Sequence, residues 1–140
     1  MKYSICYYNR LNTNGTGSLE IKVTDNNRTP ITNALVKIYR MSYEGVYNES
    51  ASGLVIAELY TNNNGIVHIV LPALNELMSP NEYYAAYIYK DGFYNAFIYY
   101  IQIYPNIGSI YEVYLTPWIE GQPERIRFFF QPKRRAVHVH

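Results

Sequence analysis

The fold is decided by one stretch near the N-terminus, GSLEIKVTDNNRTPITNALVKIYR, which covers residues 17–40. Apolar and polar residues alternate strictly over residues 19–23, and such alternation predicts a strand with one buried face. Residues 25–30 then supply Asx side chains and a proline with a fixed φ, which predict a turn. Alternation resumes over residues 34–39. The stretch therefore predicts two half-buried β-strands joined through a turn.

The same pattern continues along the chain. Further strands are predicted at residues 54–60, 67–71, 83–90, 94–104 and 109–116. Asn, Gly and Pro mark the turns between them, and no apolar stripe with a helical period reaches 11 residues. Seven short strands with frequent turns predict an all-β fold, a seven-stranded Greek-key β-sandwich. We expect the following side chains to point inward: Ile21, Val36, Ile69, Ala85 and Ile101.

Composition excludes several classes of protein. A length of 140 residues fits one domain, and 49% hydrophobic residues supply a core without metals or disulfides. Cys6 is the single cysteine, so no intrachain disulfide is possible. A net charge of +1 argues against a nucleic-acid partner. No apolar run is long enough for a signal peptide or a membrane span, so we expect synthesis in the cytosol and no membrane partner.

Residues 18–118 resemble the carboxypeptidase regulatory-like, or transthyretin-like, family of β-sandwich domains, which is related to prealbumin and to Cna-B domains. The likeness is carried by GSLEIKV at 17–23, TPITNALVKI at 29–38, TNNNG at 61–65, LPA at 71–73, YAAYIYKDGF at 84–93 and SIYEVYLTP at 109–117. The LPA loop followed by Ser-Pro is also similar to domains attached to clostridial spore cortex-lytic enzymes. The resemblance implies a sandwich fold.

Two active branches of that family can be compared residue by residue. Hydroxyisourate hydrolases end in Tyr-Arg-Gly-Ser, whereas this chain ends in VHVH at 137–140. Cna-B-type domains can form a Lys–Asn isopeptide bond beside a buried carboxylate. Lys22 stands near the lysine position, but residues 84–89 contain no Glu and residues 112–116 contain no Asn. The resemblance therefore implies neither activity.

No residue pattern indicates catalysis. Cys6, His68, His138 and His140 show no nucleophile-and-base signature, and no glycine-rich phosphate loop is present. His138 and His140 alone make a poor metal site, because closed sites usually need four ligands. We therefore expect no enzyme, no metal and no cofactor.

The chain continues for 22 residues after Trp118, where the sandwich should be complete. We divide it into an N-terminal arm (1–17), the sandwich (18–118) and a C-terminal arm (119–140). Seven basic and nine acidic residues lie in 1–118, against five basic and two acidic in 119–140. Both arms contain a strand-like segment. The residues expected to mediate self-association are Tyr3, Ile5, Tyr7, Arg125, Ile126, Arg127, Phe128, Phe129 and Phe130.

A one-sided apolar strand outside a complete domain needs a partner. The C-terminal segment can fold back on its own sandwich or add to the sheet edge of a neighbour. Both alternatives remain open from the sequence. The leading hypothesis is a non-catalytic structural subunit that self-assembles through its arms by strand addition into a homo-oligomer or filament. Such an assembly would be a spore layer, an appendage or a phage tail component, with a cell-wall or spore polymer as a further partner.

We expect such an assembly to reside at a spore or bacterial surface, in a virion or outside the cell. The alternative function is a carbohydrate- or cell-wall-binding module that uses exposed tyrosines of residues 83–104. The chain has 17 tyrosines, and tyrosine suits half-buried sheet positions and interfaces.

Overall fold

The computed structural model describes residues 15–44, 50–121 and 126–130. Its eight strands are β1 (Thr16–Thr24), β2 (Leu35–Glu44), β3 (Ser50–Tyr60), β4 (Ile66–Pro72), β5 (Glu82–Tyr89), β6 (Asn95–Ile101), β7 (Gly108–Tyr114) and β8 (Ile126–Phe130). Strands β1 to β7 correspond to the seven predicted strands, and no helix occurs in the described residues. The prediction of an all-β sandwich is confirmed.

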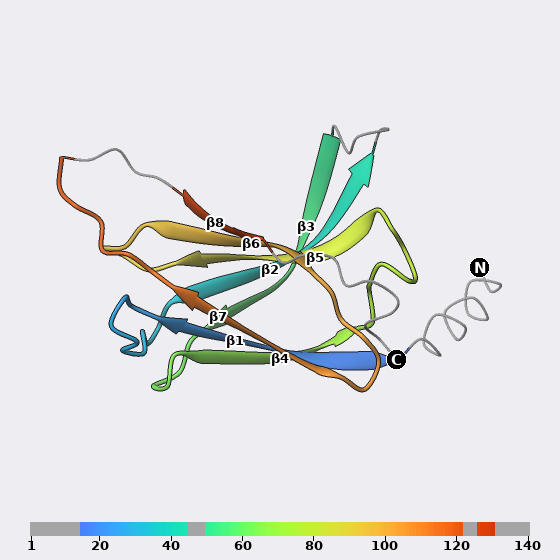
Figure 1. Cartoon of the computed structure of the whole chain (residues 1–140), viewed down its shortest axis with the longest axis horizontal. Helices are drawn as coiled ribbons and strands as arrows, with labels where there is room; N and C mark the ends of the chain where they lie inside the picture. The colour runs from blue at the N-terminus through green and yellow to red at the C-terminus, as the bar shows by residue number, and fades with distance from the viewer. Residues whose placement is uncertain (1–14, 45–49, 122–125, 131–140) are drawn as a thin grey trace.

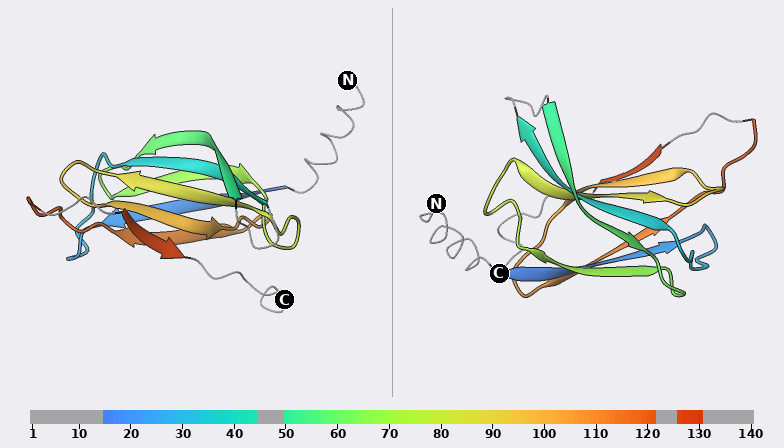
Figure 2. Two further views of the ribbon diagram at one scale, coloured as in Figure 1. Left: turned by 90° about the horizontal axis from the view of Figure 1, so that it is seen from above. Right: turned by 180° about the vertical axis from the view of Figure 1, so that it is seen from behind.

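Two sheets face each other (Figures 1 and 2). The smaller sheet has the order β4-β1-β7 and the larger has the order β3-β2-β5-β6-β8. Strand β1 pairs antiparallel with β4 and parallel with β7. In the larger sheet, β2 pairs antiparallel with both β3 and β5. Among the described strands, the sheet edges are therefore β4, β7, β3 and β8.

The core lies between the sheets, and β1 shows how the sequence pattern builds it. Leu19, Ile21 and Val23 are fully buried, whereas the residues between them are half-exposed. The expected core positions Ile21, Val36 and Ile101 belong to the buried cluster. Ile69 is only partly buried, but it packs against that cluster. These four inward placements are confirmed.

The fifth expected core residue, Ala85, is placed wrongly by the sequence. It is buried at 1% exposure, yet the core cluster contains its neighbour Ala86 instead. Ala85 pairs with Tyr39 on the opposite face of the larger sheet. Residues 83–86 of β5 are all buried, so this strand shows no alternation that could reveal which face is inward.

Buried polar groups fix the connections between strands. The Thr61 hydroxyl donates to the carbonyl of Ile31 (2.7 Å) and accepts from the backbone N–H of Ala34 (2.8 Å). The long connection after β4 contains one helical turn, in which the Ser79 N–H donates to the Asn75 carbonyl at 3.0 Å. The buried Asn75 side chain also donates to the carbonyl of Ile103 (2.9 Å).

Candidate functional site

The C-terminal strand joins the edge of the larger sheet. Strand β8 pairs in parallel with β6, and the register places Asn95 opposite Ile126, Phe97 opposite Phe128 and Tyr99 opposite Phe130. Of the residues expected to self-associate, Ile126, Arg127, Phe128, Phe129 and Phe130 thus form a strand. Tyr3, Ile5, Tyr7 and Arg125 lie outside the described residues, as do Cys6, His138 and His140. Within this single chain, the arm takes the fold-back alternative.

The chain leaves the sandwich at a defined point before it reaches β8. Leu115 donates to the Thr24 carbonyl (2.8 Å), and Pro117 forms a bridge with Phe93. The Trp118 N–H then donates to the Gly92 carbonyl (2.8 Å). The chain crosses from the smaller sheet to the larger one at this end of the molecule (Figure 1). Residues up to 118 are therefore tied to the body, and the connection to β8 is residues 119–125.

A network of aromatic rings covers the outer face of the larger sheet, beside β8. Its rings come from β2, β5 and β6, and seven ring pairs connect them with centroid separations of 4.5–6.3 Å. The members are Tyr39, Tyr43, Tyr83, Tyr87, Phe97, Tyr99 and Tyr100. We call this set the outer aromatic network. Edge-on pairs such as Phe97–Tyr99 at 4.5 Å add stability beyond simple burial.

A β-bulge in β6 makes room for this network. The register between β5 and β6 shifts between Tyr84 and Ala86, and Tyr100 has a positive φ of 61°. A bulge sets two residues of one strand opposite a single residue of its partner. Both Tyr99 and Tyr100 consequently contribute rings to the network, and the partner strand carries the small side chain of Ala85 at this point. No sequence signal marked the bulge.

Tyr43 is the most unusual group in the network. Its side chain is 8% exposed, and its buried hydroxyl has no hydrogen-bond partner among the described residues. Burial raises the pKa of Tyr43 to about 12, with smaller contributions from Tyr100, Tyr99 and Tyr83. A tyrosine is ordinarily neutral at physiological pH, and burial disfavours the phenolate of Tyr43 further.

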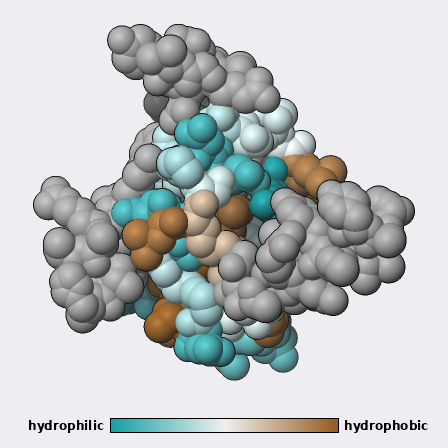
Figure 3. Space-filling view, turned by 90° about the vertical axis from the view of Figure 1, so that its right-hand side faces the viewer, coloured by the Kyte–Doolittle hydropathy of each residue, from teal (hydrophilic) through white to brown (hydrophobic). Residues whose placement is uncertain are grey.

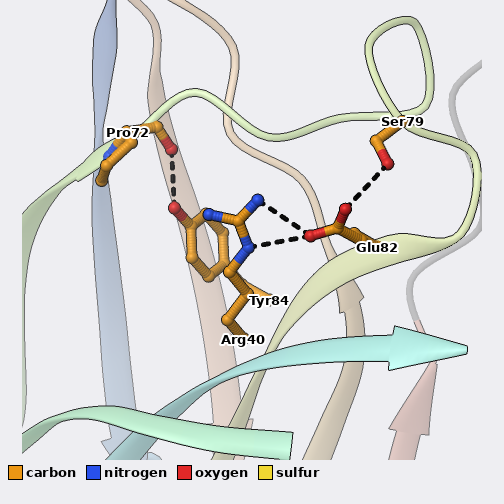
Figure 4. Close-up of polar contacts among 5 residues, drawn as sticks. All are labelled: Arg40, Pro72, Ser79, Glu82 and Tyr84. Atoms are coloured by element: carbon orange, nitrogen blue, oxygen red, sulfur yellow. Dashed lines mark hydrogen bonds and ion pairs between the residues drawn. The ribbon is translucent and has the colours of Figure 1, made fainter. Parts of the chain in front are cut away.

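A second polar cluster ties the two sheets together (Figure 4). The Tyr84 hydroxyl of β5 donates to the Pro72 carbonyl at the end of β4 (2.8 Å). Next to it, Arg40 forms an ion pair with Glu82 at 2.8 Å, and Ser79 donates to the other oxygen of Glu82 (3.3 Å). Burial raises the pKa of Tyr84, Arg40 lowers it and Glu82 raises it. Each of the four side chains in this cluster has at least one protein partner.

The described residues offer no cluster of groups arranged for metal binding. No three His, Cys, Asp or Glu side chains gather there where they could hold a metal ion. His68 is exposed on the outer face of the smaller sheet, opposite Glu20. A cleft of about 350 Å³ lies beside the turn after β1. One carboxylate oxygen of its Asp25, Oδ1, accepts from the backbone N–H groups of Asn27 (2.8 Å) and Thr29 (2.9 Å).

The tyrosines of residues 83–104 are less accessible than the carbohydrate-binding alternative requires. Tyr83 and Tyr84 are 0% and 1% exposed, and Tyr104 is 9% exposed. Tyr89 is the most exposed described tyrosine of this segment, at 41%. Seen from the end of the molecule, apolar residues form separate small patches between polar ones (Figure 3). Among the described tyrosines of this segment, Tyr89 alone is therefore well exposed to a sugar.

Comparisons with known proteins place the chain at the level of its fold. No protein-family model matches the sequence, and no curated protein matches it either. Solved structures do share the fold. A mutant of catechol 1,2-dioxygenase from Acinetobacter radioresistens matches with a TM-score of 0.53 at 12% identity, over 86% of this chain and 56% of that one. The 3-chlorocatechol 1,2-dioxygenase of Rhodococcus opacus 1CP matches with a TM-score of 0.51 at 10% identity, over 74% of this chain and 60% of that one.

The Bacillus anthracis TIE protein matches with a TM-score of 0.51 at 18% identity, over 74% of this chain and 17% of that one. This chain thus spans only part of the length of each of these proteins. At such identities the likeness shows the fold alone. It confirms the β-sandwich part of the resemblance drawn from the sequence, while the narrower transthyretin-like family stays a prediction.

These comparisons correct the expectation that the chain is not an enzyme. That expectation, which was drawn from missing residue patterns, is wrong as a conclusion, because catechol and 3-chlorocatechol 1,2-dioxygenases contain a sandwich of the same kind. A sandwich of this shape can belong to a catalytic protein, and fold does not decide function in either direction.

The structure also shows whether a described helix could span a membrane. Across residues 15–44, 50–121 and 126–130, no helix is long and apolar enough to cross a bilayer.

Proposed function

We propose that this chain is a structural subunit that assembles with further copies of itself by exchanging its C-terminal arm. The observation that carries the proposal is the position of β8. It pairs only with β6 among the described strands, after seven strands have already enclosed the core. The buried cluster is already formed by residues of β1, β2, β4, β5, β6 and β7, with Ala57 and Leu59 of β3 packed against it.

The connection between the body and β8 is long enough for exchange. Seven residues, 119–125, separate the last anchored residue, Trp118, from the first residue of β8. Extended, they span roughly 23–25 Å. Gly121 has a φ of 88°, a conformation that is easy for glycine and lets the chain change direction at low cost. A hinge of this length allows β8 to reach β6 of an adjacent copy.

Exchange preserves the contacts that the single chain already shows. The five backbone pairs between β6 and β8 form equally well within one chain or between two. The balance between the two states therefore depends on protein concentration and on the hinge, and not on new contacts. Reciprocal exchange between two copies closes into a dimer, whereas sequential exchange produces a polymer.

The N-terminal arm takes part in this proposal as a second exchangeable segment. Tyr3, Ile5 and Tyr7 alternate with other residues in the sequence, as a strand with one apolar face would. We further propose that the assembly is a spore layer, an appendage, a phage tail component or a comparable surface structure, and that a cell-wall or spore polymer can contact it. Strand addition is a recurrent means of building such assemblies.

Disulfide trapping tests the proposal. In a Cys6→Ser background, Asn95→Cys and Ile126→Cys place two thiols at backbone partners of β6 and β8. Under mild oxidation at tens of micromolar, we expect disulfide-linked dimers and larger species on a non-reducing denaturing gel. A matched control combines Asn95→Cys with Phe130→Cys, which are not partners and should not cross-link. Exclusive formation of intrachain disulfides at every concentration would show that the arm stays with its own sandwich.

A further inference from the structure

Strand β3 forms the other edge of the larger sheet and has exposed apolar side chains on both of its faces. It pairs only with β2 in the part of the chain that the structure describes. At 11 residues it is the longest described strand. Leu54, Val55 and Ile56 are consecutive and are 67%, 42% and 39% exposed. An edge of this kind is a template for pairing with another strand.

The usual protection of an exposed edge is missing from residues 50–55 of β3. Sheet edges are commonly blocked by lysine, by proline, by charged residues that point inward or by β-bulges. The sequence of β3, SASGLVIAELY, contains no lysine, arginine or proline, and Glu58 is its single charged residue. The register with β2 shifts at Ile56, but residues 50–55 form a regular ladder before that point.

The position of β3 leaves room for a partner. The far ends of β2 and β3 extend together away from the rest of the sandwich, and two opposite views agree on this (Figures 1 and 2). A second molecule can therefore approach the free edge of β3 without meeting the smaller sheet. Tyr43 and Tyr83 of the outer aromatic network pack together near this end and support β2.

We infer that a second copy of this chain pairs antiparallel with β3 about a twofold axis through Leu54. A twofold axis perpendicular to the sheet keeps each residue on its own face, so a residue meets one at an even separation in sequence. With the axis at this position, Leu54 of one copy lies opposite Leu54 of the other copy, and Val55 lies opposite Gly53. Residues 50–55, the regular part of the strand before the bulge, contain no charged residue, so no like charges meet beside the axis. This part of the strand can therefore pair with a second copy of itself without charge repulsion.

The contact predicts a particular form of assembly. Strands β3 and β8 are the opposite edges of the five-stranded order. A twofold contact at β3 combined with arm exchange at β8 links copies into an open chain; this consequence rests on the proposed function, whereas the β3 contact does not. Pairing of one short segment buries less than the roughly 800 Å² per partner of a standard interface. The contact should therefore depend on concentration in the micromolar range.

Introducing a charge at Leu54 tests the inference in the full-length chain. Leu54→Lys and Leu54→Glu each bring two like charges into direct opposition across the axis, which disfavours pairing. Because Leu54 is 67% exposed, neither variant should disturb the fold. In sedimentation velocity experiments at tens to hundreds of micromolar, we expect each variant alone to show a weight-average mass at least about twofold below the wild type. An equimolar mixture of the two should recover the wild-type mass.

The control is Val70→Lys, which places the same charge on an exposed apolar residue of β4, at the edge of the other sheet. It should leave the mass unchanged. If the two Leu54 variants keep the wild-type mass, or if their mixture stays as small as each alone, the β3 contact is wrong. Arm exchange does not affect this comparison, because the arm is intact in all these proteins.

Discussion

Tyr100 has a φ of 61°, in the left-handed region of the backbone, and its ring meets the ring of Tyr83 edge-on at 4.7 Å between centroids. A left-handed conformation is unfavourable for a bulky residue and persists only where the surroundings compensate for it. Ring packing supplies that compensation here. The bulge in β6 and the outer aromatic network therefore depend on each other.

The aromatic network should contribute strongly to stability. Tyr83 is fully buried, so Tyr83→Ala should reduce the free energy of unfolding by about 3–5 kcal/mol through loss of a large packed ring. Tyr100→Gly should reduce the free energy of unfolding by less. Glycine adopts the left-handed conformation at a cost that is about 1 kcal/mol lower than for other residues. Urea unfolding measures both. Tyr89→Ala is the control on the same strand, and at 41% exposure it should change the midpoint little. Equal effects at positions 83 and 89 would contradict the network.

The core assignment predicts an order of effects. Ile21 is fully buried and Ile69 only partly, so Ile21→Ala should cost about 2–5 kcal/mol and Ile69→Ala less. Val70→Ala should be nearly neutral, because Val70 is 60% exposed. Denaturant midpoints for the three variants measure this order. A reversed order would show that the register of β4 against β1 is wrong.

The Thr61 hydroxyl should be more important than its size suggests. Thr61→Val keeps the shape but leaves the buried N–H of Ala34 and the carbonyl of Ile31 without this partner. An unsatisfied buried polar group costs about 1–3 kcal/mol. Thr61→Ser retains the hydroxyl and should lose much less in the same unfolding assay. Equal losses in the two variants would indicate that the methyl group is what matters.

Two buried tyrosines should respond oppositely to removal of their hydroxyls. Tyr84→Phe loses the hydrogen bond to Pro72 and should cost about 1 kcal/mol at pH 7. Tyr43→Phe should be neutral or stabilising, because the Tyr43 hydroxyl is buried and unpaired among the described residues. Denaturant midpoints at pH 7 distinguish the two. A clear loss in Tyr43→Phe would reveal a partner for this hydroxyl.

The raised pKa of Tyr43 adds a pH dependence to that pair. Its folded pKa of about 12 exceeds the unfolded value near 10, so folding favours the neutral phenol. The corresponding stability is fully present below pH 10 and is lost as pH rises from 10 towards 12. The wild type should therefore lose more stability than Tyr43→Phe between pH 9 and pH 11. Parallel losses in the two proteins would place Tyr43 in a more hydrated site.

The sequence correctly predicted those parts of the fold in which one face of a strand is exposed to solvent. Strand β1 alternates strictly, and its inward residues were identified correctly. Strand β5 is buried on both faces over residues 83–86, so Ala85 and Ala86 could not be told apart. The bulge at Tyr100 depends on packing between strands and has no local signature, because positive φ values are usually signalled by glycine or asparagine.

The candidate site, like the fold, was predicted only in part from the sequence. The strand character of residues 126–130 could be read from the sequence, but the partner strand β6 could not, because edge pairing is a tertiary property. The outer aromatic network was suggested only by the number of tyrosines. The exposure of β3 was not predicted, since residues 54–60 alone do not reveal whether their strand is central or at an edge.

Sedimentation velocity of the chain with and without residues 119–140 tests arm exchange most directly. Both proteins should contain Leu54→Lys, so that the β3 contact is absent. The deletion leaves strands β1 to β7 and the buried cluster from Leu19 to Leu115 in place, so a folded sandwich should remain. At tens of micromolar, we expect the chain with its arm to sediment as a dimer or larger species and the chain without it to sediment as a monomer. A monomeric chain with its arm intact at the same concentration would contradict arm exchange.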